Sequence, residues 1–153
     1  MCGGQVIYVP FTFIHLPTWR ALMPYGGAIP WPVDDADGYL EYFRTRWAEE
    51  EDFTNIEHDV VVQPGQLEQF AQCLSEWCVI PELNGSPSMS LVRYRAGFIR
   101  ANKGIWTDDW VLPAGQRKGW TWLDSHLQAH ADREPCEHRS IPAVNTRPHG
   151  PAH

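Results

Sequence analysis

Two carboxylates one residue apart, Glu57 and Asp59, follow an apolar stretch that is typical of a buried strand. On an extended strand, residues i and i+2 project from the same face, so both side chains would point to one place and His58 away from it. Carboxylate oxygens are the ligands that Mg²⁺ and Mn²⁺ prefer, and ligands of open α/β sheets bind beyond the carboxyl ends of strands. The triplet predicts part of a divalent-cation site; the alternative is a pair of acids that face solvent at a strand end.

Three cysteines and a histidine form a second candidate constellation. Four residues separate Cys73 from Cys78, and His138 stands two positions after Cys136. Four nitrogen and sulfur donors are the set that structural zinc uses. The spacing is not that of a usual zinc knuckle, and Cys73 is expected inside a helix, so buried free thiols are the alternative.

Several other activities lack their motifs. The sequence has no glycine-rich loop ending in Gly-Lys-Ser/Thr and no Gly-x-Ser-x-Gly turn, which argues against P-loop enzymes and serine hydrolases. His126 and His130 share a helix face but lack the glutamate of zinc proteases. A net charge of −7 argues against general nucleic-acid binding. No apolar run reaches the roughly 20 residues of a membrane span, and the first residues do not read as a secretion signal, so a cytoplasmic protein is expected.

The elements that must position these residues alternate between strands and helices. Strands rich in β-branched and aromatic residues are expected at 5–9, 53–62 and 89–93. Helices are expected at 18–23, 34–51, 64–77, 94–102 and 119–131. The alternation predicts a single α/β domain over residues 1–131, with a mostly parallel sheet flanked by helices. Residues 132–153 are rich in proline and have little periodicity, which predicts a tail that wraps the domain or is disordered.

Three stretches carry a resemblance to a known family. The stretch IEHDVVVQPGQLEQFAQCLSEWC, Ile56–Cys78, resembles the metal-binding strand and following helix of GT-A-type glycosyltransferases, in particular small proteins of bacteriophage and bacterial genomes. GWTWLDSHL, at Gly119–Leu127, resembles the acceptor-side helix of that family, and CEHRSIPAV, at Cys136–Val144, resembles its closing histidine-containing segment. The resemblance extends from about Thr54 to Val144 and implies a truncated GT-A architecture, which is Rossmann-like.

The resemblance implies a metal site and a catalytic base. In the GT-A fold an Asp-x-Asp motif holds a divalent cation against a nucleotide-sugar diphosphate, and Glu57-His58-Asp59 stands at the matching place with Glu for the first Asp. Glu57 and Asp59 would then bind Mn²⁺ or Mg²⁺ and the diphosphate, with His138 as a further metal ligand. Asp124 would be the general base that deprotonates an acceptor hydroxyl; the alternative is a solvated acid on a helix.

The resemblance also implies contacts with the two substrates. Arg93 and Arg95 would neutralise phosphate, because a guanidinium group suits bidentate contact with phosphate oxygens. Trp120 and Trp122 would stack on the faces of acceptor sugars. The alternatives are plain surface charge for the two arginines and core packing for Trp120.

The expected function is that of a metal-dependent glycosyltransferase. It would pass a sugar from a nucleotide-diphospho-sugar to a hydroxyl acceptor on a glycan or a protein. Few elements precede Glu57 to bind the base and ribose, so a non-catalytic glycan- or nucleotide-binding remnant of the same fold is one alternative. An interaction protein stabilised by zinc on the cysteines is another.

Overall fold

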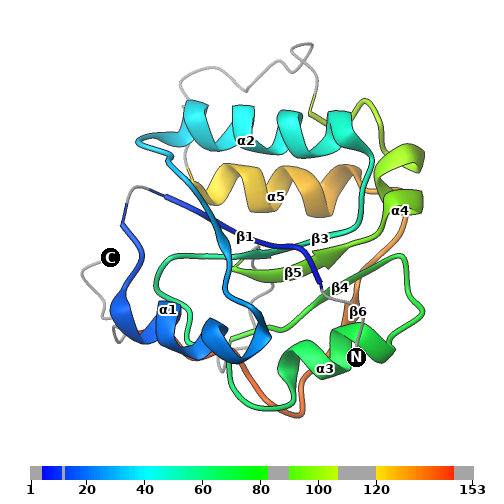
Figure 1. Ribbon diagram of the computed structural model, residues 1–153. Helices are drawn as coiled ribbons and strands as arrows, with labels where there is room; N and C mark the ends of the chain where they lie inside the picture. The colour runs from blue at the N-terminus through cyan, green and yellow to red at the C-terminus, as the bar shows by residue number, and fades with distance from the viewer. Residues whose placement is uncertain (1–4, 12, 83–89, 107–119, 147–153) are drawn as a thin grey trace.

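The computed structural model describes residues 5–11, 13–82, 90–106 and 120–146. Its centre is a six-stranded sheet with the order β2-β1-β3-β5-β4-β6 and helices on both faces (Figure 1). The strands are β1 (Ile7–Pro10), β2 (Ile29–Trp31), β3 (Phe53–Ile56), β4 (Trp77–Val79), β5 (Leu91–Tyr94) and β6 (Cys136–Glu137). The helices are α1 (Leu16–Leu22), the short 3-10 helix η1 (Met23–Tyr25), α2 (Ala36–Glu49), α3 (Gln66–Gln72), α4 (Ala96–Ala101) and α5 (Trp120–His130). This arrangement confirms the expected α/β class.

Three of the five strand pairings are parallel, as expected for a mostly parallel sheet. β1 pairs in parallel with β2 and β3, and β6 pairs in parallel with β4. β5 alone runs antiparallel to its neighbours, β3 and β4. The carboxyl ends of the other strands therefore lie along one edge of the sheet, which we call the carboxyl edge.

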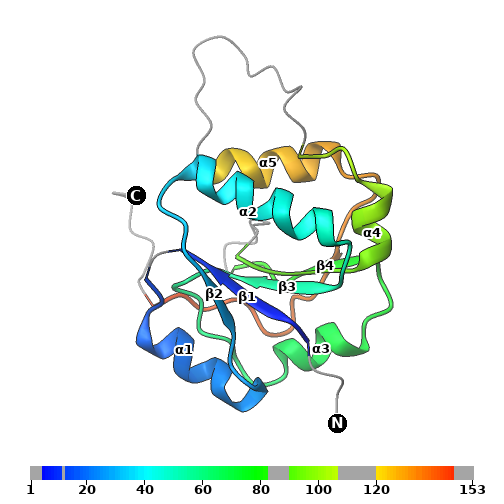
Figure 2. The same ribbon diagram turned by 45° about the horizontal axis from the view of Figure 1, so that its top comes forward.

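The sheet separates two layers of helices and two hydrophobic cores. α2 and α5 lie side by side over one face, whereas α1 and α3 cover the other (Figures 1 and 2). The core under α2 and α5 is largely aromatic and includes Phe43, Trp47, Tyr94 and Phe98. Successive strand residues alternate between the cores, so Trp77 and Val79 of β4 face the aromatic core and Cys78 faces the other. No helix in the described ranges has the length and apolar character needed to cross a membrane.

Helix α2 begins where the sequence predicts. Asp35 is its N-cap, because Asp35 Oδ1 accepts a hydrogen bond from the N–H of Gly38 at 2.8 Å. The helix ends at Glu49, before the expected position, because Glu50 adopts a left-handed conformation with φ 50°.

Helix α3 is shorter than expected, and a strand that the sequence analysis did not predict follows it. Cys73 leaves the helix with φ −79° and ψ 129°. Leu74, expected on the apolar stripe, is 84% exposed. Arg93 Nη2 and Arg95 Nη2 donate hydrogen bonds to the Cys73 carbonyl oxygen at 2.9 and 2.7 Å. These two bonds satisfy the carbonyl oxygen in place of the N–H group that a further turn of helix would supply. Trp77, the expected end of the helix, is instead the first residue of β4.

Residues 132–146, which we call the returning segment, run along the sheet and across its carboxyl edge. Their first part includes β6, which extends the sheet beside β4. Further on, the N–H of Ala143 donates to the Pro81 carbonyl at 3.0 Å. The N–H of Val61 then donates to the Val144 carbonyl at 2.7 Å. The returning segment therefore connects the end of β4 with the residues that follow β3.

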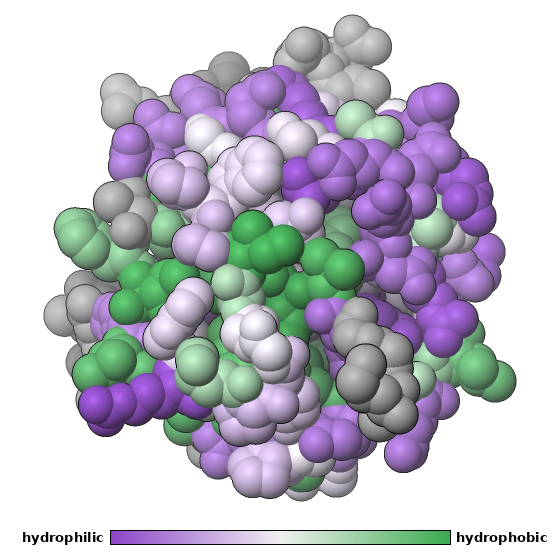
Figure 3. Space-filling view, in the orientation of Figure 1, coloured by the Kyte–Doolittle hydropathy of each residue, from purple (hydrophilic) through white to green (hydrophobic). Residues whose placement is uncertain are grey.

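Strand β2 forms one edge of the sheet, opposite β6, in a proline- and glycine-rich stretch where no strand was expected. Ile29 of this strand is 45% exposed, and a hydrophobic area occupies the middle of this face of the molecule (Figure 3). Pro30 has no N–H group, so the edge is poorly suited to pairing with a further strand.

We expect Asp35→Ala to lower the free energy of unfolding by about 1 kcal/mol, because the N-cap hydrogen bond to Gly38 is lost. Asp35→Asn keeps a capping oxygen and should remain close to the parent protein. Urea unfolding followed by circular dichroism measures both variants. Equal stability of Asp35→Ala and Asp35→Asn would contradict the assigned cap.

Candidate active site at the carboxyl edge

The chain leaves β1 and β3 in opposite directions along the sheet. From β1 it goes to β2 on one side, and from β3 it goes to β4 on the other. Ligands of open α/β sheets bind at such a switch point, beyond the carboxyl ends of the two strands. Phe11, directly after β1, has φ 110°, a strained conformation for a large side chain. Strained residues of this kind cluster at functional sites, and the Glu57-His58-Asp59 triplet lies directly after β3.

The Glu57-His58-Asp59 triplet forms a turn. The N–H of Glu57 donates to the Ser90 carbonyl at 2.8 Å, and the N–H of Val60 donates back to the Glu57 carbonyl at 3.1 Å. The expected extended geometry, with both carboxylates on one face of a strand, is therefore wrong, because β3 ends at Ile56. The two carboxylates still share one short turn at the carboxyl edge.

Two distant segments hold the backbone of this turn. The N–H of His15 donates to the His58 carbonyl at 3.0 Å, and the N–H of Thr146 donates to the Asp59 carbonyl at 2.7 Å. The two segments are also tied to each other, since His15 Nδ1 and Thr146 Oγ1 share a hydrogen bond of 2.6 Å. The backbone that carries Glu57 and Asp59 is thus fixed from both sides.

Glu57 has a strongly raised pKa. Burial, followed by the negative charges of Asp124, Asp59 and Glu82, raises the pKa of its carboxyl group from 4.5 to about 8. Four carboxyl groups therefore gather here: two from the turn, Glu82 from the residues after β4, and Asp124 from α5. Acids with pKa values shifted by burial and by neighbouring charge are typical of functional sites.

Asp124, the expected base, belongs to this carboxylate cluster. Leu123 and Leu127 of the same helix are buried in the aromatic core, which fixes α5 against the sheet. The side chain of Asp124 is half-buried, and among the charged neighbours it contributes most to the raised pKa of Glu57. The structure thus brings together three predicted site residues, Glu57, Asp59 and Asp124.

A buried hydrogen-bonded group lies next to the carboxylate cluster. Tyr42 OH donates to Asn55 Oδ1 at 2.8 Å, and Asn55 Nδ2 donates to Tyr39 OH at 3.2 Å. Burial raises the pKa of Tyr39 well above its ordinary value, and the charges of Glu57 and Asp124 add to the shift. Tyr39 therefore stays protonated and adds no further negative charge beside the carboxylates.

His138 does not join Glu57 and Asp59 as a third metal ligand. It follows β6, and the strand order places β5 and β4 between β3 and β6. Three strand spacings of about 4.8 Å separate the two backbones by roughly 14 Å. The imidazole of His138 lies instead beside Cys73 and Cys136.

Arg93 and Arg95 also lie away from the carboxylate cluster. β5 is antiparallel to β3, so Arg95 follows a strand end that pairs with the first residue of β3, Phe53. Both guanidinium groups donate to the Cys73 carbonyl at the end of α3. The structure therefore does not place them where they would neutralise a phosphate bound at Glu57 and Asp59. The side chains of Trp120 and Trp122 lie outside the described residues, so their stacking role stays a prediction.

Sequence reasoning missed Glu82, Phe11 and the hydrogen-bonded pair of His15 and Thr146. Glu82 could have been found if β4 had been predicted, because an acid just after a parallel strand lies at the carboxyl edge. The strained conformation of Phe11 has no sequence signal, since left-handed backbone favours glycine and asparagine over aromatic residues. The hydrogen bond between His15 and Thr146 depends on the tertiary fold.

We expect Glu57→Gln to weaken the pH dependence of stability. Because the pKa of Glu57 is raised on folding, the folded protein holds an extra proton between about pH 4.5 and pH 8, and stability falls as the pH rises through that window. The melting temperature of the parent protein should therefore fall across this window in chelator-treated buffer, and that of Glu57→Gln should fall less. Glu51→Gln, which changes an exposed glutamate, should keep the parent profile. Parallel profiles for all three proteins would contradict the raised pKa.

Comparisons with solved structures show a glycosyltransferase-like fold. The chain is similar to a glycosyltransferase involved in the glycosylation of the major capsid of PBCV-1, with a TM-score of 0.55 and 12% identity over 88% of this chain and 82% of that chain. It is also similar to A197 from STIV, with a TM-score of 0.55 and 10% identity over 92% of this chain and 84% of that chain. No protein-family model and no curated protein matches the sequence. At these identities the likeness shows a Rossmann-like, glycosyltransferase-type fold.

Proposed function

We propose that this protein is a metal-dependent glycosyltransferase. It transfers a sugar from a nucleotide-diphospho-sugar to a hydroxyl acceptor on a glycan or a protein. The observation that carries the proposal is the carboxylate cluster of Glu57, Asp59, Glu82 and Asp124, which lies at the switch point of a glycosyltransferase-like fold. A cluster of like charges favours a ligand that brings positive charge to it.

The residues of the turn fit Mn²⁺ or Mg²⁺. Glu57 and Asp59 would hold the ion, because both are oxygen donors on a backbone that is fixed from both sides. The negative charges of Asp124, Asp59 and Glu82, which help to raise the pKa of Glu57, would also favour a cation, and the cation would displace the proton of Glu57. When bound, the ion supplies positive charge that stabilises the departing diphosphate.

Asp124 is the proposed general base. Its carboxylate accepts the proton of the acceptor hydroxyl while that oxygen bonds to the anomeric carbon of the donor sugar. The bond between the anomeric carbon and the diphosphate oxygen breaks in the same step, so the configuration at that carbon is inverted. Asp124 suits this role because it comes from α5, a different element from the turn proposed to hold the metal. Trp120 and Trp122 in the first turn of α5 are proposed to stack on the acceptor sugar.

A donor nucleotide should raise the melting temperature only when Mn²⁺ is present. At 100 times its dissociation constant a ligand adds about 2.7 kcal/mol, which corresponds to roughly 5–10 °C for a domain of this size. The measurement is a thermal-shift panel of nucleoside diphosphates and their sugars, with and without Mn²⁺. Asp59→Asn and Glu57→Gln should abolish the shift, whereas Glu51→Gln should retain it. A shift that survives both site variants would contradict the metal assignment.

Asp124→Asn should separate catalysis from donor binding. With the donor found in the panel, we expect turnover to fall about 10²- to 10⁴-fold, because the general base is lost, while the thermal shift is retained. Ser125→Ala, next in the same helix, should change turnover little. Radiolabelled sugar transfer or release of the nucleoside diphosphate gives the rate. Binding of donor without any transfer in the parent protein would instead identify a nucleotide-binding protein of the same fold.

A further inference from the structure

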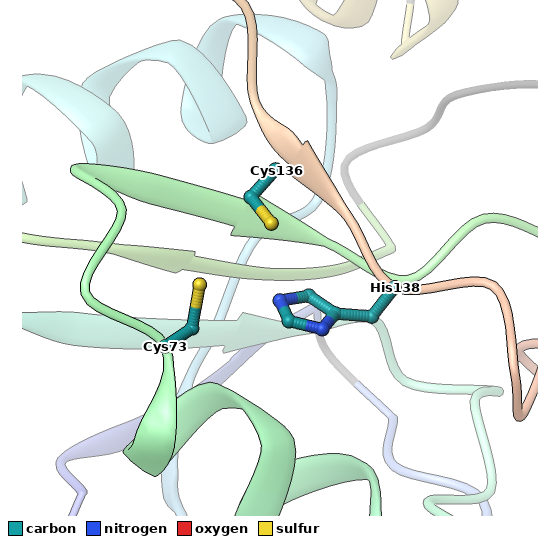
Figure 4. A group of neighbouring side chains, drawn as sticks. All are labelled: Cys73, Cys136 and His138. Carbon is teal, nitrogen blue, oxygen red and sulfur yellow. The ribbon is translucent and has the colours of Figure 1, made fainter.

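A second group of side chains that can bind a metal lies near β6, the edge strand farthest from β2. Cys73 is the C-cap of α3, Cys136 belongs to β6, and His138 follows that strand. One ligand atom from each of the three lies within 4.8 Å of the other two. Figure 4 shows both sulfur atoms and a ring nitrogen of His138 turned toward one common space. Both cysteines are free thiols.

The imidazole of His138 is held in place but incompletely satisfied. Its backbone N–H donates to the Val79 carbonyl at 3.0 Å, and its ring meets the ring of Phe70 edge-on with centroids 5.9 Å apart. Nε2, the ring nitrogen that faces the sulfur atoms, is buried, and its hydrogen-bonding neighbour is the thiol of Cys73. A thiol is a weak hydrogen-bond partner, so a metal ion would satisfy this buried nitrogen better.

We infer that Cys73, Cys136 and His138 form a zinc site. Two sulfur donors and one imidazole nitrogen select Zn²⁺ over the hard cations that carboxylates bind. Tetrahedral zinc with bonds of about 2.3 Å to sulfur holds its sulfur ligands about 3.8 Å apart, so the three side chains need only small rotations. All three are half-buried, so solvent reaches the site and an ion could enter it.

Positive charge next to the site favours binding by two thiolates. Arg93 Nη2 donates to the Cys73 carbonyl at 2.9 Å and to Cys78 Sγ at 3.3 Å. Arg95 Nη2 donates to the same carbonyl at 2.7 Å. The two guanidinium groups therefore offset negative charge at the sulfur side of the site. The structure places the two arginines that were expected at a phosphate beside the Cys73 carbonyl instead.

The zinc site would fasten the returning segment to the rest of the fold. β6 has only two residues, and few main-chain hydrogen bonds hold so short a strand. Cys136 and His138 lie on the returning segment, whereas Cys73 ends α3. An ion bound to all three therefore joins α3 to the segment whose Thr146 holds the turn of Glu57 and Asp59.

The test measures metal directly and does not depend on transferase activity. Protein purified under reducing conditions should contain one equivalent of zinc by mass spectrometry. Cobalt substitution should give the thiolate charge-transfer band and the visible bands of a tetrahedral site. Cys73→Ser and His138→Ala should each lower zinc affinity at least about 100-fold, since even residues that only orient a ligand are worth 10- to 100-fold. His138→Cys, which restores a donor, should recover zinc binding.

Two controls separate loss of a ligand from loss of the fold. Leu74→Ser changes the exposed neighbour of Cys73, and His130→Ala removes an exposed histidine of α5; both should bind zinc as the parent does. Removing zinc with a chelator should lower the melting temperature and speed amide exchange in residues 132–146, and adding zinc should reverse both changes. Parent protein that is folded, reduced and unable to bind zinc would overturn the proposal. Recovery of Cys73 and Cys136 as a disulfide under reducing conditions would overturn it as well.

Discussion

The burial of the Glu57 carboxyl group beside three other carboxyl groups is the constraint on which the carboxyl edge of this structure depends. Burial disfavours the ionised form of Glu57, and the negative charges of Asp124, Asp59 and Glu82 disfavour it further. Side chains under such repulsion would move apart if their backbone were free. The turn after β3 is instead fixed by hydrogen bonds from Val60, His15 and Thr146 to its three carbonyl groups. The backbone of the fold thus holds these carboxyl groups close together although ionisation of Glu57 is unfavourable there.

The two groups of side chains that can bind a metal differ in the chemistry of their ligand atoms. The carboxylate cluster between β1 and β3 contains hard oxygen atoms, and the group of Cys73, Cys136 and His138 contains soft sulfur and nitrogen atoms. The hard cations Mg²⁺ and Mn²⁺ that suit the carboxylates would bind the sulfur and nitrogen donors poorly. The returning segment passes by both, because it includes Cys136 near its start and Thr146 at its end. The returning segment therefore links the group of Cys73, Cys136 and His138 to the turn that carries Glu57 and Asp59.

Much of the fold could be predicted from local signals. Asp35 caps a helix as its residue type and position indicate, and the apolar residues of β3 end where the acids begin. The missed strands β2, β4 and β6 have two or three residues each, so pairing with neighbours rather than local sequence pattern makes them strands. Pro30 in β2 lacks an N–H group and so argues against a strand, but an edge strand such as β2 can accommodate a proline.

The candidate site was predictable to the extent that its residues follow predicted elements. Glu57 and Asp59 follow a strand that could be recognised, and Asp124 lies on a recognisable helix, so all three reach the same edge. His138, Arg93 and Arg95 were assigned by resemblance, without knowledge of where their strands lie in the sheet. The antiparallel direction of β5 and the edge position of β6 decide their place, and neither can be derived from spacing along the chain.

The pairing between the turn and the returning segment has a consequence for the order in which the protein matures. Val60 and Asn145 are bridge partners about 85 residues apart, so this contact costs more chain entropy to close than the local contacts of the helices do. During synthesis, all four acids of the cluster are added to the chain before residues 144–146, which hold their turn. A nascent chain that stops short of residue 144 therefore carries the acids without the backbone hydrogen bonds to Asp59 and Val61 that position them.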